Sequence, residues 1–312
     1  SAFKLFTVGS AFEHKVATLA SNYYCEQGHL KVDGHIISEA ESHERYEWLS
    51  VADIVKFSSN VGTTKIAFDL TFPKLKETLK SLNFGEKTGI EVPGESRGIF
   101  TEAENVTALS LSNISFGQGI AVTGVQMLGA YAAIANGGEY NRPTLIKKDR
   151  SQVAELEPEN DRQMQKKVRV FAPKTSEDLT KALVGVVEAG TGVTAQIPHF
   201  KIAGKTATAQ RVDKNGGYHG YVAGFIGFPV NVDKRFVIYV YIDNPKVGGY
   251  YGGAVAAPVF KNLAQYMLYK NKDIRKLADS DEKLEQNLDL KKIKNNIDIV
   301  QEKYSATRVY DP

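Results

Sequence analysis

The chain has 312 residues, of which 42% are hydrophobic and 24% are charged, and its formal net charge is +3. This length and composition are typical of a globular protein with one large core or two smaller ones. The small net charge, with no basic run interleaved with aromatic residues, argues against the nucleic-acid-binding classes.

Cysteine content and hydropathy narrow the class further. Cys25 is the only cysteine, which excludes a disulfide within the chain and a multi-cysteine metal site, and we expect it to be a small buried hydrophobe. No apolar run approaches the ~20 residues of a membrane span, and no secretory signal opens the sequence. A helical pattern begins at once at Ser1, so we expect further residues upstream.

The first part of the chain is predicted as helices followed by a turn-rich segment. Apolar residues recur at roughly helical spacing at its start, which predicts a helix over residues 1–20. The stretches "LSVADIVKF" (49–57) and "NVGTTKIAFDL" (60–70) predict two short helices, with "SSN" at their junction. The segment "NFGEKTGIEVPGESRG" (83–98) is rich in turn residues and predicts no regular element.

The second part of the chain changes from helix to strand. Helices are predicted over 123–138, which ends in two glycines, and over 175–190, which begins with cap-type residues. Three β-rich runs separated by turns predict an antiparallel meander of three strands, at 200–210, 221–230 and 235–243. A last apolar helix is expected over about 254–270, and residues 271–312 form a charged tail of mixed sign.

The stretch "SAFK" brings a hydroxyl and an amine together. Lys4 follows Ser1 by about one helical turn, so both side chains share a helix face. A serine becomes a nucleophile when a base removes its proton, and a buried lysine can be that base if it is neutral. The spacing alone is not specific, because "SDEK" (280–283) in the charged tail has it too.

The stretch "SSN" (58–60) offers a serine that could relay a proton and an asparagine that could bind a substrate amide. Taken alone, this stretch is more typical of a helix cap, because serine and asparagine are favoured at N-caps. The stretch "SLN" (81–83) has the same pattern.

The stretch "GKTAT" (204–208) lies on the first predicted strand of the meander. It is not a phosphate-binding loop, because His199 stands where that loop needs its first glycine and no helix follows. A strand at a sheet edge can pair with an extended peptide, and Lys205, Thr206 and Thr208 would offer a cation and hydroxyls to a carboxylate.

The three stretches occur in the order that marks penicillin-binding proteins and class A β-lactamases: Ser-x-x-Lys, Ser-x-Asn and Lys-Thr followed by a small residue. The stretches "SSNVGTTKIA", "SFGQGIAVTGVQMLGAYAAIANGG", "EAGTG", "KIAGKTATAQ" and "GGYYGGAVAAPVFKNL" add to this pattern. Over about residues 1–270 the chain resembles the transpeptidase domain of class B penicillin-binding proteins, most closely the septal, cell-division type.

A second Lys-Thr-Gly occurs at 87–89 and is a rival for the third motif. It has the usual glycine, whereas Ala207 occupies that place after Lys205 and Thr206. We favour Lys205, because Lys87 lies in the turn-rich segment and no strand meander follows it. An extra methyl at Ala207 could narrow the cleft for bulky β-lactams.

The resemblance implies the α/β penicillin-recognising fold, an antiparallel sheet flanked by helices with the active site at the sheet edge. In that family two strands precede the nucleophile helix, so a transpeptidase domain over 1–270 is expected to lack them, with the charged tail over 271–312. A membrane anchor and a further module are also expected upstream. They would hold the domain at the periplasmic or extracytoplasmic face of the bacterial cytoplasmic membrane.

The resemblance implies acyl transfer on peptidoglycan, which cross-links stem peptides. Ser1 would attack the D-Ala-D-Ala carbonyl of a stem peptide, and Lys4 would take its proton. Ser58 would relay a proton to the departing D-Ala under the influence of Lys205.

The remaining motif residues would bind the substrate in the same scheme. Asn60 would hold the peptide amide, and Thr206 and Thr208 would hold the terminal carboxylate. The backbone N–H groups of Ser1 and Thr208 would form the oxyanion hole. No metal or organic cofactor is implied.

The resemblance also names partners and leaves two alternatives open. It implies β-lactams as inhibitors, and a glycosyltransferase and other cell-division proteins as partners. A serine β-lactamase would share these motifs but needs a base that activates water, which we do not identify in the sequence. A β-lactam sensor would be acylated without transferring the acyl group. The flanking segments of septal type argue against both alternatives.

Overall fold

The computed structural model describes residues 1–41, 43–101, 103–146, 167–212, 217–232 and 235–270. The chain divides into two compact units, Ser1–Phe260 and Lys261–Pro312. The expected charged tail, with its "SDEK" stretch, lies outside the described residues. Among the described helices none is both long and apolar enough to cross a membrane.

The central element of the first unit is a buried helix, α1 (Lys4–Glu13). Its side chains from Lys4 to Ala11 are all buried, as expected for a helix that is enclosed on every side. The expected helix over 1–20 is therefore shorter at both ends. It stops at Glu13 because the backbone turns at Lys15, whose φ is 55°. The amides of Val16 and Ala17 both donate to the carbonyl of Ala11 and close the helix.

Between α1 and the next helix lie two small ribbons that the sequence did not predict. Strand β1 (Asn22–Tyr24) pairs with β4 (Trp48–Ser50), and β2 (His29–Val32) pairs with β3 (His35–Ser38), both antiparallel. A short turn of 3₁₀-helix, η1 (Glu26–Gly28), joins β1 to β2. Strands of three or four residues carry too few side chains to show a period of two.

Helices α2 (Val51–Phe57) and α3 (Asn60–Leu70) confirm the two predicted around "SSN". The described residues also form the helices α4 (Phe72–Ser81), α5 (Ala108–Ser115), α6 (Gly124–Ala135) and α8 (Pro173–Ala189). Helix α6 begins with a capping box between Thr123 and Gln126. Helix α8 begins two residues before the prediction, because Pro173 suits the first turn of a helix.

The predicted meander is confirmed as the sheet β7 (Lys201–Val212), β8 (Tyr218–Val230) and β9 (Ile238–Asp243), in that order and antiparallel throughout. A second 3₁₀ turn, η2 (Val193–Ala195), precedes β7. The predicted last helix is two elements, α9 (Gly252–Val255) and α10 (Ala257–Lys270).

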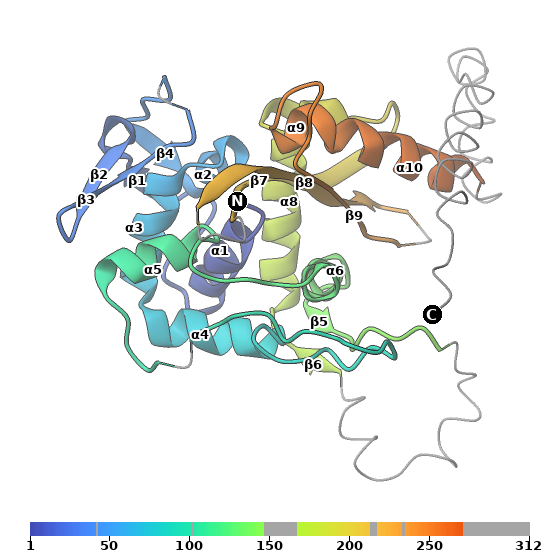
Figure 1. Cartoon of the computed structure of the whole chain (residues 1–312), viewed down its shortest axis with the longest axis horizontal. Coiled ribbons are helices and arrows are strands. Elements are labelled where there is room, and N and C mark those ends of the chain that lie inside the picture. Colours follow the sequence, from blue (N-terminus) through green and yellow to red (C-terminus); the bar gives the residue numbers. More distant parts are fainter. Residues whose placement is uncertain (42, 102, 147–166, 213–216, 233–234, 271–312) are drawn as a thin grey trace, which may run out of the picture. The chain divides into compact units, whose positions relative to one another are not determined.

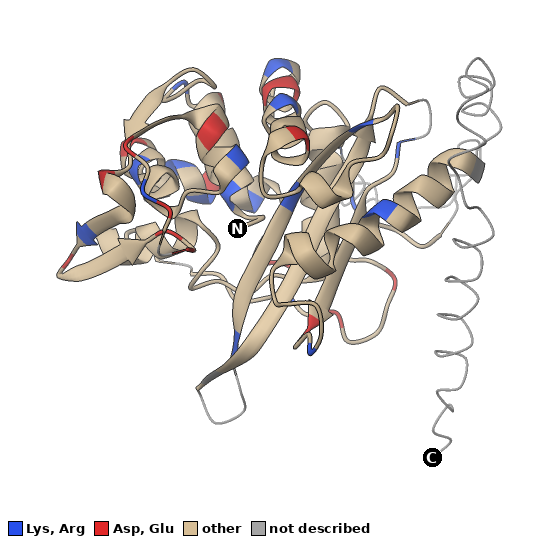
Figure 2. Cartoon of the chain, turned by 90° about the horizontal axis from the view of Figure 1, so that it is seen from above, with Lys and Arg blue, Asp and Glu red and all other residues tan. Residues whose placement is uncertain are grey.

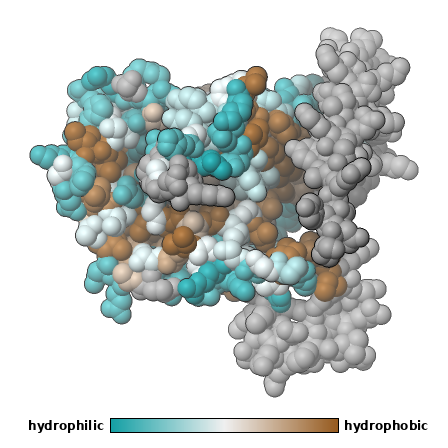
Figure 3. Space-filling view, in the orientation of Figure 1, coloured by the Kyte–Doolittle hydropathy of each residue, from teal (hydrophilic) through white to brown (hydrophobic). Residues whose placement is uncertain are grey.

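Helices cover both faces of the three-stranded sheet, as Figure 1 shows. On one face, Ile226 and Phe228 of β8 join the core that contains α1, α6 and α8. Phe225 points to the other face, where its ring lies 4.7 Å from that of Phe260, at the start of α10. The expected arrangement of an antiparallel sheet flanked by helices is therefore confirmed. On the face seen in Figure 3, apolar residues are interspersed with polar ones.

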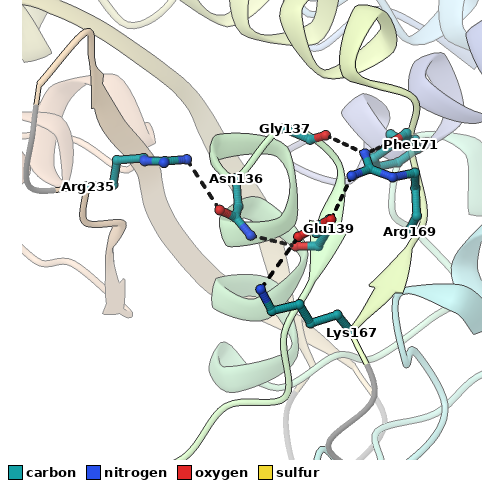
Figure 4. Close-up of polar contacts among 7 residues, drawn as sticks. All are labelled: Asn136, Gly137, Glu139, Lys167, Arg169, Phe171 and Arg235. Atoms are coloured by element: carbon teal, nitrogen blue, oxygen red, sulfur yellow. Dashed lines mark hydrogen bonds and ion pairs between the residues drawn. The ribbon is translucent and has the colours of Figure 1, made fainter. Parts of the chain in front are cut away.

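A polar cluster links the end of α6 to two neighbouring segments (Figure 4). In the ribbon β5 (Glu139–Tyr140) and β6 (Val168–Arg169), Arg169 donates to the Glu139 carboxylate at 2.7 Å and to the Gly137 carbonyl at 3.0 Å. Arg235, which precedes β9, donates to Asn136 Oδ1 at 3.3 Å. These contacts are partly exposed, so each contributes little to stability. They link the end of α6 to the ribbon and to Arg235.

Candidate active site

Ser1 lies directly before α1, and its side chain meets that of Lys4. Lys4 Nζ donates to Ser1 Oγ at 3.2 Å, and the Lys4 backbone N–H donates to the Ser1 carbonyl at 3.3 Å. Lys4 is only 1% exposed. The residues of "SAFK" therefore form the hydroxyl–amine pair that the spacing predicts, with Ser1 in the turn before the helix rather than within it.

Ser58 joins α2 to α3 and adopts a left-handed backbone, with φ 64° and ψ 37°. This conformation is unfavourable for a residue other than glycine, so the surrounding structure has to hold it. The Ser58 hydroxyl accepts from Lys4 Nζ at 3.0 Å, and its carbonyl accepts from the same ammonium group. The helix-cap role that is typical of "SSN" belongs to Ser59, whose Oγ accepts from the Gly62 N–H at 2.9 Å.

Lys205 reaches the same serine from the sheet. It lies on β7 opposite Ile226 of β8 and is fully buried. Its Nζ donates to Ser58 Oγ at 2.9 Å and lies 3.4 Å from Thr206 Oγ1. The chain end at Ser1 lies beside β7 in both views of the molecule (Figures 1 and 2). The four residues Ser1, Lys4, Ser58 and Lys205 thus form one continuous hydrogen-bonded chain.

Burial shapes the protonation of the two lysines. The pKa of Lys4 falls from 10.5 to about 8 because burial removes water from its ammonium, although Glu39 and Glu44 oppose the shift. Burial also lowers the pKa of Lys205, and the positive charge of Lys4 lowers it further. Both shifts favour the neutral amine, so a fraction of Lys4 is unprotonated near neutral pH and can act as a base.

The predicted substrate-binding residues lie around this chain. Thr206 Oγ1 is 2.7 Å from Thr191 Oγ1, and Thr208 Oγ1 accepts from the Gly252 N–H at 3.1 Å. Helix α9 approaches the sheet this closely because residue 252 is a glycine, since a Cβ there would overlap the carbonyl oxygens of the strands. Asn60 Nδ2 donates to the Ser38 carbonyl at 2.7 Å, so Asn60 is oriented by the end of β3.

The rival Lys-Thr-Gly at 87–89 lies elsewhere. It is in an irregular loop, where the Glu95 carboxylate accepts from the N–H groups of Thr88 and Gly89 at 2.8 and 2.9 Å. Lys87 is exposed, whereas Lys205 is buried and contacts Ser58. Ala207 shares a strand face with Lys205 and is partly buried against the core.

Comparison with known proteins identifies the family. The profile of the penicillin binding protein transpeptidase domain matches residues 1–265. The chain belongs to this family. Among curated relatives, this transpeptidase domain is 34% identical over 267 residues to stage V sporulation protein D of Bacillus subtilis, which covers 84% of the chain and 41% of that protein. It is 31% identical over 236 residues to peptidoglycan D,D-transpeptidase FtsI of Escherichia coli, with 74% and 37% covered.

Solved structures agree with this assignment. The transpeptidase domain of penicillin-binding protein 3 from Burkholderia pseudomallei is 29% identical with a TM-score of 0.76, covering 86% of this chain and 78% of that one. Penicillin-binding protein 3 of Mycobacterium tuberculosis in complex with aztreonam is 28% identical with the same TM-score of 0.76, covering 86% and 62%. This chain spans less than half the length of the curated relatives named above.

Three features of the transpeptidase domain were missed by sequence reasoning. Glu39, which belongs to no motif used above, contacts Ser59 and Asn60. Thr191, which lies in the "EAGTG" stretch but was given no role, contacts Thr206. The third feature is an aromatic stack near the β9–α9 connection. Its ring centroids lie 4.1 Å and 4.3 Å apart for Tyr221–Tyr250 and Tyr250–Tyr251. The doubled tyrosine in "GGYYGG" was the available signal for the stack, and the "EAGTG" stretch was the signal for Thr191.

Proposed function

We propose that this domain catalyses serine D,D-transpeptidation of peptidoglycan stem peptides. The observation that supports the proposal most is the hydrogen-bonded chain that links Ser1, Lys4, Ser58 and Lys205 through contacts of 3.2, 3.0 and 2.9 Å. A chain of this kind can carry a proton from a nucleophile to a leaving group. The family and the name of the relative FtsI give the substrate class.

The first half of the reaction forms an acyl-enzyme. Ser1 Oγ attacks the carbonyl carbon of the penultimate D-Ala, and neutral Lys4 takes the hydroxyl proton. The oxyanion receives hydrogen bonds from the backbone N–H groups of Ser1 and Thr208. When the C–N bond breaks, Ser58 passes a proton from Lys4 to the nitrogen of the departing D-Ala.

The second half transfers the acyl group. An amine from a neighbouring stem peptide attacks the Ser1 ester, and neutral Lys4 takes a proton from this amine. Lys4 then gives that proton to Ser1 Oγ as the C–O bond breaks, which restores the hydroxyl of Ser1 and the neutral amine of Lys4. Lys205, Thr206 and Thr208 hold the terminal carboxylate of the donor during acylation, and Asn60 holds its peptide amide. β-Lactams resemble the donor peptide and acylate Ser1. Because the β-lactam ring opens, the amine that would leave stays attached to the acyl group.

The setting of the reaction is also a proposal. The likeness to FtsI supports septal cell-wall synthesis at the periplasmic or extracytoplasmic face of the cytoplasmic membrane. The anchor and the contacts with a glycosyltransferase and other cell-division proteins would belong to sequence outside the described domain. The domain boundary at about residue 270, with a separate tail over 271–312, is proposed on the same grounds.

The lifetime of the penicilloyl adduct tests the function against a β-lactamase and a sensor. We expect a fluorescent penicillin to label the intact protein and the adduct to persist for hours. We also expect a D-Ala-D-Ala donor peptide to be transferred to an added amine acceptor. Rapid loss of the label by hydrolysis would identify a β-lactamase, and labelling without transfer to any acceptor would identify a sensor.

A further inference from the structure

A buried carboxylate lies behind the junction of α2 and α3. Glu39 follows the last residue of β3 and is 8% exposed. One of its oxygens, Oε1, accepts from Ser59 Oγ at 2.5 Å, and the other, Oε2, accepts from the Asn60 N–H at 2.6 Å. Both oxygens are thus used by the two residues that follow Ser58.

The energetic cost of burying this carboxylate indicates that its position matters. Burial raises the pKa of Glu39, while its hydrogen bonds from Ser59 and Asn60 and the positive charge of Lys4 lower it. Hydrogen bonds to a carboxylate are stronger than neutral ones, and a negative charge is favoured at a helix N-terminus such as that of α3. These contacts offset part of the cost of the lost hydration and hold the carboxylate in one place.

The same segment fixes the residues after Ser58 from a third direction. Asn60 Nδ2 donates to the carbonyl of Ser38, the neighbour of Glu39, at 2.7 Å. The Glu39 N–H donates to the Gly28 carbonyl at 3.2 Å, which ties the segment to the turn before β2. Residues 38–39 therefore act as a bracket for residues 59–60.

The bracket bears directly on the strained serine. Ser58 keeps its left-handed backbone only if its neighbours are held, because a relaxed backbone would turn its hydroxyl away from Lys4 and Lys205. A displacement of about 1 Å at a reacting group can slow an enzyme by about 100-fold. Loss of the bracket would therefore be felt at the Ser58 hydroxyl, although Glu39 does not touch it.

We propose that Glu39 is a positioning residue for acyl transfer, which holds Ser59 and Asn60 so that the Ser58 hydroxyl stays between the two lysines. The proposal rests on the proposed function, because it assigns Ser58 to proton transfer. Glu39 does not serve as a hydrolytic base in this arrangement, since both of its oxygens already accept hydrogen bonds from the protein.

Loss of a carboxylate charge and loss of the bracket should change the pH profile of acylation in different ways. The negative charges of Glu39 and Glu44 raise the pKa of Lys4. Lys4 and Lys205 both donate to the Ser58 hydroxyl. Removal of either carboxylate should lower the pKa of Lys4 and move the acidic limb of the profile to lower pH. Only the loss of Glu39 should also lower the maximum rate in the profile. The Glu44 carboxylate accepts hydrogen bonds from the Glu41 N–H and the Tyr46 hydroxyl, and not from Ser59 or Asn60.

The test compares Glu39→Gln with Glu44→Gln in the intact protein. The measurement is the second-order rate of acylation by a fluorescent penicillin from pH 5 to 10, with the melting temperature of each variant. We expect Glu39→Gln to lower the maximum by about 10- to 100-fold, and Glu44→Gln to keep it within about twofold. A Glu39→Gln protein with the wild-type maximum would overturn the proposal. An equal loss in both variants would overturn it too, because charge alone would then explain the effect.

A second variant covers the case in which Glu39→Gln does not fold. Ser59→Ala removes one partner of Glu39 but keeps the carboxylate charge, so we expect a lower maximum without a shift of the acidic limb. In the double variant Glu39→Gln/Ser59→Ala, the change at Glu39 should lower the maximum acylation rate by a smaller factor than it does alone, because the two residues act through one contact. A Ser59→Ala protein with the wild-type maximum would contradict the bracket. A wild-type protein that is not acylated at all would overturn the proposed function, and the role of Glu39 with it.

Discussion

Lys4 and Lys205 share one hydrogen-bond partner, the hydroxyl of Ser58, at 3.0 and 2.9 Å. One lysine comes from the buried helix α1 and the other from the strand β7, so helix and sheet meet at a single oxygen atom. Two positive charges that lie this close together and are both buried destabilise each other, so the charge of Lys4 adds to burial in lowering the pKa of Lys205. Burial also lowers the pKa of Lys4, which favours the neutral amine that the proposed base needs.

The first prediction concerns the pH dependence of acylation. Lys4 must be neutral to accept the proton of Ser1, and its pKa is lowered to about 8. The rate should therefore rise with pH up to about 8, because deprotonation of Lys4 creates the base. Acylation rates with a penicillin that does not itself titrate over this range would measure this acidic limb.

A flat profile between pH 6 and 9 would contradict this assignment of the base. So would an acidic limb that persists unchanged in Lys4→Met, a variant of similar shape that does not titrate. The control is the melting temperature over the same pH range, which separates a change in chemistry from unfolding.

The second prediction concerns the acylated residue. The Ser1 hydroxyl accepts a hydrogen bond from Lys4, whereas the Ser58 hydroxyl accepts from both Lys4 and Lys205. Peptide mapping after β-lactam treatment should find the adduct on Ser1, and Ser1→Ala should abolish it. Ser58→Ala should slow acylation by about 100-fold or more while Ser1 remains the labelled site. An adduct on Ser58 in the wild type would overturn the map of the site.

The elements that carry the chemistry were predictable from sequence because each has a strong local signal. The helices around Ser58 have helical periodicity and cap residues, and the meander around Lys205 consists of three long β-rich runs. The order of the motifs then identified the family. What assembled Ser1, Lys4, Ser58 and Lys205 in space was tertiary packing, which none of these local signals describes.

Residues that support the site could not be predicted, for a related physical reason. Glu39 lies in a polar stretch after a four-residue strand, where an acidic residue is expected to be solvated. Its burial depends on α3, whose first turn begins 21 residues later along the chain. The contact between Thr191 and Thr206 likewise depends on how the loop after α8 folds onto β7. Contacts of this kind leave no period in the sequence.

The third prediction concerns Thr191. Its hydroxyl lies 2.7 Å from Thr206 Oγ1, which also lies 3.4 Å from Lys205 Nζ. The Lys205 ammonium can only donate, so Thr206 Oγ1 accepts from it. If the Thr191 hydroxyl also donates to Thr206 Oγ1, the Thr206 proton is left to bind a substrate carboxylate. Thr191→Val keeps the shape and removes this partner, and it should weaken acylation about 5- to 10-fold, the scale of one hydrogen bond.

Thr191→Ser is the matched control, because it restores the hydroxyl and should recover most of the rate. The loss in Thr191→Val should appear with a donor peptide that ends in a carboxylate and be much smaller with one that ends in an amide. Equal losses with both peptides would mean that Thr191 supports the loop and not the carboxylate.

The fourth prediction compares the two lysines that precede a threonine. Lys205→Met should slow acylation by about 100-fold or more, the usual scale for loss of a positioned electrostatic or proton-transfer group. Its fold should persist, because methionine fills the space of a buried lysine without the cost of burying a charge. Lys87→Met, at an exposed loop position, should leave the acylation rate unchanged at equal melting temperature. The reverse result, a silent Lys205→Met and an inactive Lys87→Met, would show that the substrate carboxylate binds at this loop and not at β7.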